Sequence, residues 1–536
     1  MKKVNLLIAT VALIGATTIF ISCSDDDNGN IIGGDDVVNS DEEAFALVNS
    51  GFQAYQDLCS TFTMLSDVAT QYGSTYMDME DDSALRLARL LHDETNDYPV
   101  WAWDDFYWSI GIANDAIEKI SASIKVSSAA KKESIARAKF IRALSYSYLV
   151  LYFGEVPIRL TVNDENTTRA SIDAVYTQIE SDLLAAEEGL PETSSTPVIP
   201  TKGAAQALLS RIYLQWGSNP LSHEEVAAIQ NSTTDPAPAH NETLLNKAIT
   251  YADKVISSQK YDLKNNFNAL FGRANESQAP EHIFTIQQDG DGIDILGNHQ
   301  YHCAWTYPFQ TSKVSHIHPI STFEDWSDDD PRKAFSIVTS ITDPKTGNVY
   351  SYKIPETMPV FGKGVDRSYA NSEWETIEKN DVDQIEIRYA EVLLNKAEAL
   401  VVLGRNSDGS ADKLINRLRK RAYGDESHGV SNATLKDVQD EWLHEFIYEH
   451  KQWQNQVRWR TLISSLKNVK YNFLYDDEYA TAGSTTSRGV VSTFAARDHA
   501  VLRAKYENAN GHLYRYPIPI GLEGEDLGVK PQNPGY

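Results

Sequence analysis

Residues 387–403 have the sequence IRYAEVLLNKAEALVVL and are followed by Gly404. Apolar residues recur in this stretch at intervals of three or four positions: Tyr389, Val392, Leu393, Ala397 and Leu400. This spacing places them on one face of an α-helix, and a glycine after the last turn is a common helix end. The stretch therefore predicts a helix with one buried face that stops at Gly404.

Other segments predict that such helices occur in pairs. A short turn centred on Gly404 separates this helix from a second helical segment of similar length, which is the arrangement of a tetratricopeptide repeat. The predicted pairs are 387–403 with 411–422, 172–190 with 202–216, and 109–121 with 133–153, and a fourth begins at 244–257. We therefore expect a mostly α fold in which tetratricopeptide-like helix pairs stack into an α/α superhelical scaffold.

Residues from about 281 to 380 interrupt the helical pattern. Two short β-type runs, Ile283–Ile286 and Asn348–Tyr352, lie there among Gly, Asp and Pro, with long irregular connections. Long connections in a compact protein are usually functional. We expect a helical scaffold over about 40–280 and 381–470, a loop-rich ligand-binding region with short strands over 281–380, and a C-terminal segment over 471–536.

The start of the chain predicts export and lipidation. A basic Met1-Lys2-Lys3 precedes an apolar run to Ile21 that is too short for a typical membrane span, so residues 1–22 are interpreted as a signal peptide. Residues 20–23, Phe-Ile-Ser-Cys, resemble a bacterial lipobox, which predicts a lipid on Cys23; a chance cysteine is the alternative. The acidic, Gly-rich residues 23–39 are expected to form a flexible tether before a single domain, 40–536.

Composition excludes several functions. The 536 residues include 48 Lys and Arg against 75 Asp and Glu, a net charge of −27, which would repel nucleic acid. Three cysteines exclude a disulfide scaffold. No Walker A, G-x-S-x-G or strand-linked G-x-G-x-x-G motif is present, so we expect neither a nucleotide cofactor nor serine-hydrolase chemistry.

Three short motifs raise the question of a metal. His444-Glu445 begins like the zinc motif H-E-x-x-H, but Tyr448 occupies the position of the second histidine. His316 and His318 alternate on a possible strand without a nearby third ligand. Residues 328–330 are three aspartates that could hold calcium, but a solvated acidic turn is the favoured interpretation. We expect no metal site. Carboxylate pairs for glycoside hydrolysis give no positive signal, so we expect no catalytic residue.

Two clusters of aromatic residues are the strongest chemical signal. Residues 98–108 contain six aromatics; a helix is expected from Asp104, with Trp101 and Trp103 in a Pro-containing turn before it and Phe106 and Trp108 in the core. A sugar ring needs an aromatic platform flanked by hydrogen-bonding groups. The candidate glycan-binding residues are Trp101, Trp103, Tyr301, Trp305, Tyr307 and Trp326. For Trp101, core packing is the alternative.

Several blocks resemble, in order, the SusD/RagB family of outer-membrane lipoproteins. The blocks are 137–143 through 152–157, 200–214, Asp330-Pro331-Arg332, 388–399 (RYAEVLLNKAEA), 516–519 and 532–536. One block departs: the family usually has E-R-R-x-E-x-x-x-E-G-x-R-x-x-D-L-x-R-W, whereas this chain has EWLHE at 441–445, EHKQW at 449–453 and then Arg458-Trp459. Those family residues look structural, so the departure concerns local packing more than function.

The resemblance implies a non-catalytic glycan-capture lipoprotein on the outer face of the outer membrane. Its implied partner is a SusC-like TonB-dependent transporter, over which it would sit as a hinged lid with the tetratricopeptide-like helices facing the barrel. The family has no shared ligand motif. The negative charge favours a neutral or N-acetylated glycan, such as a glucan or chitin-like oligomer. The alternatives are a surface glycoside hydrolase, a RagB-like lid for peptides, and an adaptor that binds only protein.

Overall fold

The structure is a computed structural model of the chain. It describes residues 37–76, 82–272, 280–288, 316–319, 326–338, 340–342, 349–351, 360–363, 383–468, 501–522 and 524–536. The chain divides into two compact units, Met1–Asp36 and Val37–Tyr536, and every described residue belongs to the second. The predicted signal peptide, Cys23 and the tether as far as Asp36 lie outside the described residues.

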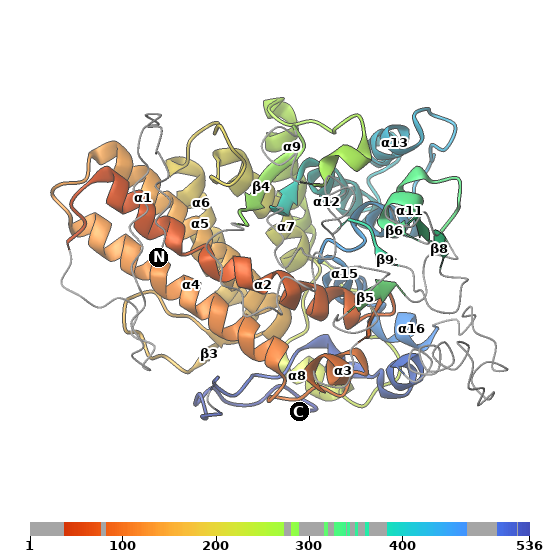
Figure 1. Cartoon of the computed structure of the whole chain (residues 1–536), viewed down its shortest axis with the longest axis horizontal. Helices are drawn as coiled ribbons and strands as arrows, with labels where there is room; N and C mark the ends of the chain where they lie inside the picture. Colours follow the sequence, from red (N-terminus) through yellow and green to blue (C-terminus); the bar gives the residue numbers. More distant parts are fainter. Residues whose placement is uncertain are drawn as a thin grey trace, which may run out of the picture. The chain divides into compact units, whose positions relative to one another are not determined.

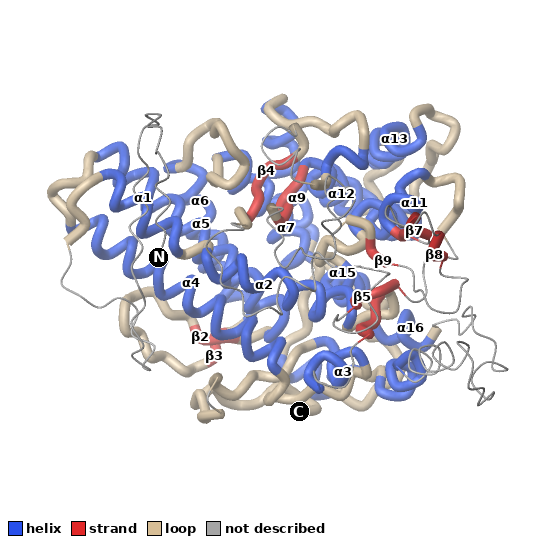
Figure 2. Tube along the Cα trace, viewed as in Figure 1, coloured by secondary structure: helices blue, strands red, loops and turns tan. Residues whose placement is uncertain are grey.

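Helices make up most of the described structure (Figures 1 and 2). They are α1 (Asp41–Ser50), α2 (Gln53–Thr63), η1 (Met64–Val68), α3 (Asp82–Ala88), α4 (Asp97–Ala122), α5 (Ser128–Phe153), α6 (Ile172–Gly189), α7 (Lys202–Gly217), α8 (His223–Ile229), α9 (Glu242–Ser258), η2 (Phe267–Leu270), α11 (Pro331–Ser336), α12 (Tyr389–Val402), α13 (Ser410–Tyr423), α14 (Leu435–Phe446), α15 (Gln452–Trp459), α16 (Leu462–Lys467) and η4 (Gly511–Tyr514). Within the described ranges, none of these helices is long and apolar enough to cross a membrane.

The described strands are short and form two-stranded antiparallel sheets. The pairs are β1 (Gly73–Tyr76) with β5 (His316–Pro319), β2 (Val156–Pro157) with β3 (Arg169–Ala170), β4 (His282–Ile286) with β10 (Gln384–Arg388), β6 (Ile337–Val338) with β9 (Val360–Phe361), and β7 (Ser340–Thr342) with β8 (Val349–Ser351). The two predicted β-type runs are confirmed as β4 and β8. Gln384–Arg388, in contrast, was not expected to be a strand.

The predicted helix pairs are confirmed. Helix α4 packs on α5, α6 on α7 and α12 on α13, and further contacts of α5 with α6, α7 with α9 and α9 with α12 join the pairs into one stack (Figure 1). Serine or threonine side chains accept a backbone N–H in the first turn of α5, α6 and α7: Ser127, Ser171 and Thr201. Such caps satisfy amide groups that a helix start leaves unpaired, and so they fix where these helices begin.

Helix α4 begins earlier than the sequence predicts. Its first residue is Asp97, and the side chain of Asn96 accepts the backbone N–H of Tyr98 as the cap. Pro99 therefore lies in the first turn, where a residue without an N–H removes no intrahelical hydrogen bond. The expected Pro-containing turn before Asp104 is wrong, and Trp101 and Trp103 are helical residues.

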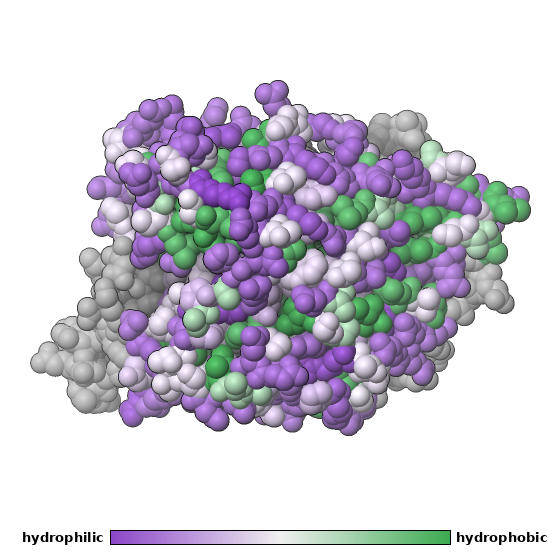
Figure 3. Space-filling model, turned by 180° about the vertical axis from the view of Figure 1, so that it is seen from behind, coloured by the Kyte–Doolittle hydropathy of each residue, from purple (hydrophilic) through white to green (hydrophobic). Residues whose placement is uncertain are grey.

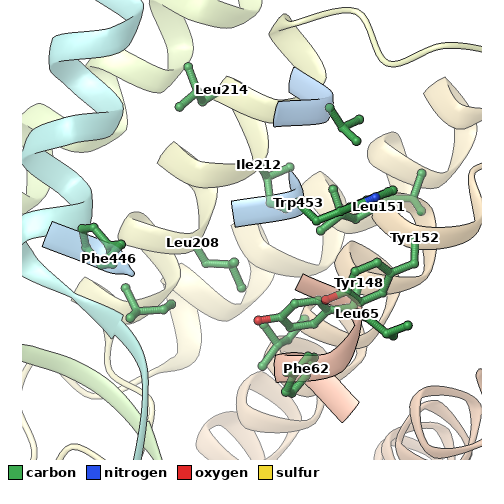
Figure 4. Close-up of a cluster of buried hydrophobic side chains, with 14 of the residues drawn as sticks. Phe62, Leu65, Tyr148, Leu151, Tyr152, Leu208, Ile212, Leu214, Phe446 and Trp453 are labelled. Atoms are coloured by element: carbon green, nitrogen blue, oxygen red, sulfur yellow. The ribbon is translucent and has the colours of Figure 1, made fainter. Parts of the chain in front are cut away.

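Aromatic and aliphatic side chains fill the core between the N-terminal helices and the C-terminal half of the chain (Figure 4). The rings of Phe106 and Tyr148 are parallel within 3°, with centroids 5.3 Å apart. The ring centroids of Phe62 and Tyr148 are 4.7 Å apart. Trp453 of α15 contacts Tyr152 of α5 at 5.6 Å. Segments distant in sequence thus share one core.

The face seen in Figure 3 is largely hydrophilic, with hydrophobic side chains in separate groups.

A network of buried ion pairs joins strand β10 to helices α13 and α14. Arg388, 1% exposed, donates to the carboxylates of Glu281 at 2.8 Å, Glu445 at 2.6 Å and Glu449 at 2.7 Å. Arg421 of α13 also pairs with Glu281 and Glu445. Burial alone would raise the pKa of Glu445, but Arg421, Arg388 and Arg332 hold it well below its ordinary value.

The D-P-R block enters the same network. Asp330 caps α11 and accepts Arg332 Nη2 at 2.8 Å, while Arg332 Nη1 reaches Glu441 at 2.6 Å and Glu445 at 2.9 Å. Glu441, Glu445 and Glu449 therefore serve as buried counter-ions. His450, which stands where the family pattern has glycine, adopts a left-handed backbone with φ of 61°. The block that departs from the family pattern is structural, as the resemblance implied.

Lys505, near the C-terminus, forms hydrogen bonds to the backbone of the loop before β1. It lies in the helical residues 501–508, is fully buried, and donates through Nζ to the backbone carbonyls of Val68, Thr70 and Gly73. Replacing Lys505 with Met should lower the free energy of unfolding by about 2–4 kcal/mol, because three buried carbonyls lose a charged donor. Chemical denaturation tests this.

A neighbouring cation provides the control for Lys505. Arg503 lies in the same helix but is exposed and pairs with Glu507. Arg503→Met should change stability by less than about 1 kcal/mol, since exposed pairs contribute little. Equal losses for the two variants would contradict the role given to Lys505.

Candidate functional site

The outward face of α4 carries a stripe of aromatic and acidic residues. Trp101, Asp104, Asp105 and Trp108 follow one another at intervals of three, one and three positions, and none of them is buried. At a rise of 1.5 Å per residue, the two tryptophans are about 10 Å apart along the helix axis. Two indoles with carboxyl groups between them can contact two rings of the same sugar chain. We call these four residues the α4 stripe.

The two tryptophans of the α4 stripe differ in burial. Trp108 is 37% exposed. Trp101 is half-buried, packs against the main core and meets the ring of Tyr98 edge-on, with centroids 5.3 Å apart and planes 75° apart. Trp101 is thus held in place by the core while part of it faces outward. The expected place of Trp108 in the core is wrong, and its spacing of seven residues from Trp101 was the signal that the two share an outward face.

Asp104 has an unusual environment between these indoles. Its Oδ2 atom is buried and finds no hydrogen-bond partner among the described residues. Burial, and secondarily the charge of Glu525, raises its pKa to about 7. Near neutral pH a substantial fraction of this carboxyl is therefore protonated. A protonated carboxyl can donate to a sugar hydroxyl as well as accept from one.

The C-terminal segment runs beside the beginning of α4. The backbone N–H of Ile520 donates to the carbonyl of Glu94 at 3.1 Å, and Gly521 N–H donates to the carbonyl of Glu525 at 2.9 Å, closing a tight turn. Leu522, at the tip of this turn, is 65% exposed. The turn brings Glu525 into the electrostatic surroundings of Asp104. Residues more than 400 positions apart thus border one surface.

The raised pKa of Asp104 predicts a pH effect on stability. The folded state holds a proton that the unfolded state releases near pH 4, so this group lowers the free energy of unfolding as pH rises from about 4 to 7. Asp104→Asn should therefore melt at a higher temperature than the parent at pH 8, and the difference should shrink towards zero at pH 4. Thermal unfolding at the two pH values measures it.

The control for Asp104 is an exposed carboxylate of the same helix, Glu118. Glu118→Gln should change the melting temperature by the same small amount at both pH values. An Asp104→Asn effect that is the same at pH 4 and pH 8 would show that the proton plays no part.

Two of the other candidate residues are buried. Trp103 is 3% exposed and packs edge-on against Phe153, with centroids 5.0 Å apart. Trp326 is 2% exposed and lies parallel to the ring of His444, with centroids 4.6 Å apart. Both indoles are enclosed by protein, which corrects the expectation that they form open platforms. Tyr301, Trp305 and Tyr307 lie outside the described residues.

The motifs considered for metals have other partners. Glu445 is engaged by three arginines, and burial lowers the pKa of His444 to about 4. His316 and His318 lie on β5, as the sequence predicted, and that strand pairs with β1. Asp330 holds Arg332, and Asp328 pairs with Lys333 at 2.6 Å. Among the described residues, no group of three or more His, Cys, Asp or Glu side chains is placed to hold a metal ion.

Comparison with known families gives two matches along the chain. Residues 40–214 match a family described as "Starch-binding associating with outer membrane", and residues 298–536 match one described as "SusD family". The two matched segments do not overlap, and they include most of the described helices. They also contain every block on which the resemblance was based.

Individual relatives agree with these matches. "SusD-like protein P2" of Formosa agariphila is 29% identical over 65% of this chain and 68% of its own length. "Starch-binding protein SusD" of Bacteroides thetaiotaomicron is 25% identical over 75% and 72%.

Solved structures show the same fold. A SusD homolog from Bacteroides thetaiotaomicron superimposes with a TM-score of 0.72 at 21% identity, covering 94% of this chain and 98% of that one. A structure described as "Laminarin binding SusD-like protein" gives 0.67 at 19% identity, covering 92% and 99%.

Proposed function

Because the chain belongs to the SusD/RagB family, we propose that it binds an oligosaccharide or polysaccharide at the cell surface and passes it, unaltered, to a SusC-like TonB-dependent transporter. The α4 stripe is the observation that supports glycan binding most directly. It offers two outward indoles about 10 Å apart with carboxyl groups between them. Aromatic faces stack on the apolar face of a sugar, and the carboxyl groups meet its hydroxyls.

The charge of the protein supports a neutral or N-acetylated glycan as the cargo. The chain carries −27 overall, and Glu525 lies near the α4 stripe, so a sulfated or uronic-acid-rich chain would be repelled. One relative is described as starch-binding and one structural neighbour as laminarin-binding. Starch and laminarin are both neutral glucans. Glucans and chitin-like oligomers are therefore the first ligands to test.

The experiment is a binding screen with a turnover arm. Maltohexaose, laminarihexaose, chitohexaose, a uronic-acid oligomer and a peptide mixture are titrated calorimetrically, and each sugar is then incubated with the protein and analysed for shorter products. Binding of a neutral sugar without cleavage is expected. Preferential binding of the peptides or of the uronic-acid oligomer would contradict the proposed cargo.

A surface glycoside hydrolase is the second candidate, and one observation favours it. Asp104 has a pKa raised to about 7 and is influenced by a second carboxylate, Glu525. An acid of raised pKa near another carboxylate is the arrangement that glycoside hydrolysis uses. Product formation that is abolished by Asp104→Asn and by Glu525→Gln would favour the hydrolase over the binding protein.

Membrane attachment through Cys23 gives a separate prediction. Cys23→Ala should release the full-length protein from the membrane fraction with its fold intact, because one thiol carries the proposed lipid. Fractionation of cells and circular dichroism of the released protein measure the two effects. Ser24→Ala, at the adjacent position, should leave the protein in the membrane. Retention of the Cys23→Ala variant would contradict the lipid anchor.

The proposed transporter partner is tested by copurification. An affinity tag at the C-terminus should bring down an outer-membrane barrel protein from detergent-solubilised cells, and mass spectrometry identifies it. Recovery of the tagged chain alone under conditions that preserve known barrel complexes would count against a transporter role and leave glycan binding as a separate function.

A further inference from the structure

A hollow lies where helices α6, α7 and α8 meet the end of the chain, and its lining shares no residue with the α4 stripe. Its volume is about 550 Å³, within the range of small-molecule sites. Trp216 at the end of α7, Asp173 at the start of α6, and His223 and Glu224 at the start of α8 contribute to its walls, and Pro531 closes one side. We call it the Trp216 cleft.

The indole of Trp216 is fixed in the wall of this cleft. Its ring is parallel within 10° to that of Tyr176 on α6, with centroids 5.5 Å apart, and its Nε1 donates to Asp173 Oδ1 at 2.7 Å. Tyr176 covers one face of the indole and Asp173 holds its edge. Since the ring is only half-buried and lines the hollow, it presents aromatic surface to the cleft in one orientation. Such a platform requires no ordering when a ligand binds.

Residues 219–225, which contribute another part of the wall, are held by buried arginines. Arg460 donates to the carbonyl of Asn219 at 2.5 Å, and Arg515 donates to the carbonyl of Leu221 at 2.6 Å. The backbone N–H of His223 donates to Glu155 at 2.8 Å. These bonds come from segments outside the wall itself. The cleft is therefore formed before any ligand arrives.

The charges around the cleft select the class of ligand. Glu155, Asp173, Glu224 and Glu225 give it four carboxylates. Arg169 pairs with Glu155 at 3.3 Å, and the buried Arg515 and Arg460 lie within electrostatic range of Glu155 and Glu225. The guanidinium of Arg169 is already engaged by the carbonyls of Glu155 and Pro531 and by Asn533 Oδ1, at 2.8, 2.6 and 2.7 Å. The four carboxylates still outnumber these three arginines, so an anionic ligand would meet a net negative surface. A neutral ligand rich in hydroxyls would meet acceptors and the amide of Asn219 around an aromatic face.

We propose that the Trp216 cleft is a second saccharide-binding site for a neutral glycan, separate from the α4 stripe. The fixed indole stacks on the apolar face of one sugar ring, and Asp173, Glu224 and Asn219 line the space where its hydroxyls lie. Only the class of ligand is shared with the proposed function. The protein would then contact a glycan chain at two places bordered by the same C-terminal segment, through Glu525 at one and Pro531 at the other.

The test uses full-length protein labelled with 5-fluorotryptophan and observed by fluorine NMR. Trp216→Phe assigns the Trp216 signal, and the unaltered chain is titrated with maltohexaose, laminarihexaose and chitohexaose. The signal should shift and saturate with at least one of them. By calorimetry, the chain should bind two equivalents of that hexasaccharide, and Trp216→Ala should bind one. The Trp101→Ala/Trp108→Ala double variant should keep the Trp216 shift.

Three other results would overturn the second binding site. A hexasaccharide that binds at the α4 stripe without shifting the Trp216 signal overturns the second site and leaves the proposed function standing. A shift caused by Nα-acetyl-lysine amide and by none of the sugars assigns the cleft to cations and overturns the saccharide proposal. If no sugar binds anywhere, both proposals fail. Because the NMR readout uses the unaltered chain, it holds even if Trp216→Ala does not fold.

Discussion

Replacing Arg388 with Ala should lower the free energy of unfolding by about 3–5 kcal/mol, or prevent folding at 37 °C. The guanidinium joins Glu281, Glu445 and Glu449, each at 2.8 Å or less, and lies 3.8 Å above the ring of Phe446. Its loss would leave three buried carboxylates short of a counter-ion. Removing one partner of a buried ion pair is expensive because the remaining charge is neither solvated nor compensated.

An exposed arginine on the same part of the chain is the control. Arg405, 46% exposed at its side chain, pairs with Glu242, and Arg405→Ala should change stability by less than about 1 kcal/mol. Denaturant titration compares the two variants. If the Arg388→Ala protein folds, its glycan preference should equal that of the parent, because Arg388 lies inside the scaffold. If the Arg388→Ala protein is as stable as the parent but has an altered glycan preference, Arg388 belongs to the binding site and not to the scaffold.

Long periodic helices were the most predictable part of the fold. The predicted segment 172–190 corresponds to α6, 202–216 to α7, and 411–422 to α13, each within one or two residues. Helices α6 and α13 bury one face, whereas α7 is buried almost all round. Glycine or a hydroxyl cap marks the ends of these helices, so local sequence carries the information on where they lie. Their pairing followed from the length and small-residue spacing of consecutive helical segments, which resemble a tetratricopeptide repeat.

Features that depend on contacts between distant segments were not predictable. The strand Gln384–Arg388 pairs with His282–Ile286, about 100 residues earlier, and nothing in its own sequence excludes a continuation of the following helix. The partners of Glu445 come from α11, β10 and α13. Glu445, in a motif that begins like a zinc site, is therefore a counter-ion for three arginines, and its own sequence neighbourhood does not indicate this.

The candidate site was predicted in part. The aromatic cluster at 98–108 led to Trp101, but the misplaced start of α4 put Trp103 on the surface and Trp108 in the core, whereas the structure has the reverse. One helical register explains both errors, because Trp101 and Trp108 are two turns apart. The Trp216 cleft was missed because its walls come from β3, α6, α7, α8 and the last residues of the chain.

The Trp101→Ala/Trp108→Ala double variant should lose most of the glycan affinity of the α4 stripe. Stacking one indole on a sugar is worth about 1–2 kcal/mol by the area removed from water, so each single variant should bind about five- to thirty-fold more weakly. If the two tryptophans contact different sugar rings, their effects should add, giving a loss of about 30- to 1000-fold. Calorimetric titration with the best hexasaccharide of the screen measures these ratios.

Stability separates binding from packing in these variants. Trp108 is 37% exposed, so Trp108→Ala should melt within a few degrees of the parent. Trp101 is half-buried against the core, so Trp101→Ala should lower the melting temperature more. Ile124, 91% exposed just beyond the other end of α4, supplies the control: Ile124→Ala removes apolar surface outside the α4 stripe and should leave affinity unchanged. A folded double variant that binds the hexasaccharide as tightly as Ile124→Ala would remove the α4 stripe from the binding site. An affinity loss confined to Trp101→Ala, and matched by its loss of stability, would mean that this indole supports the surface from within.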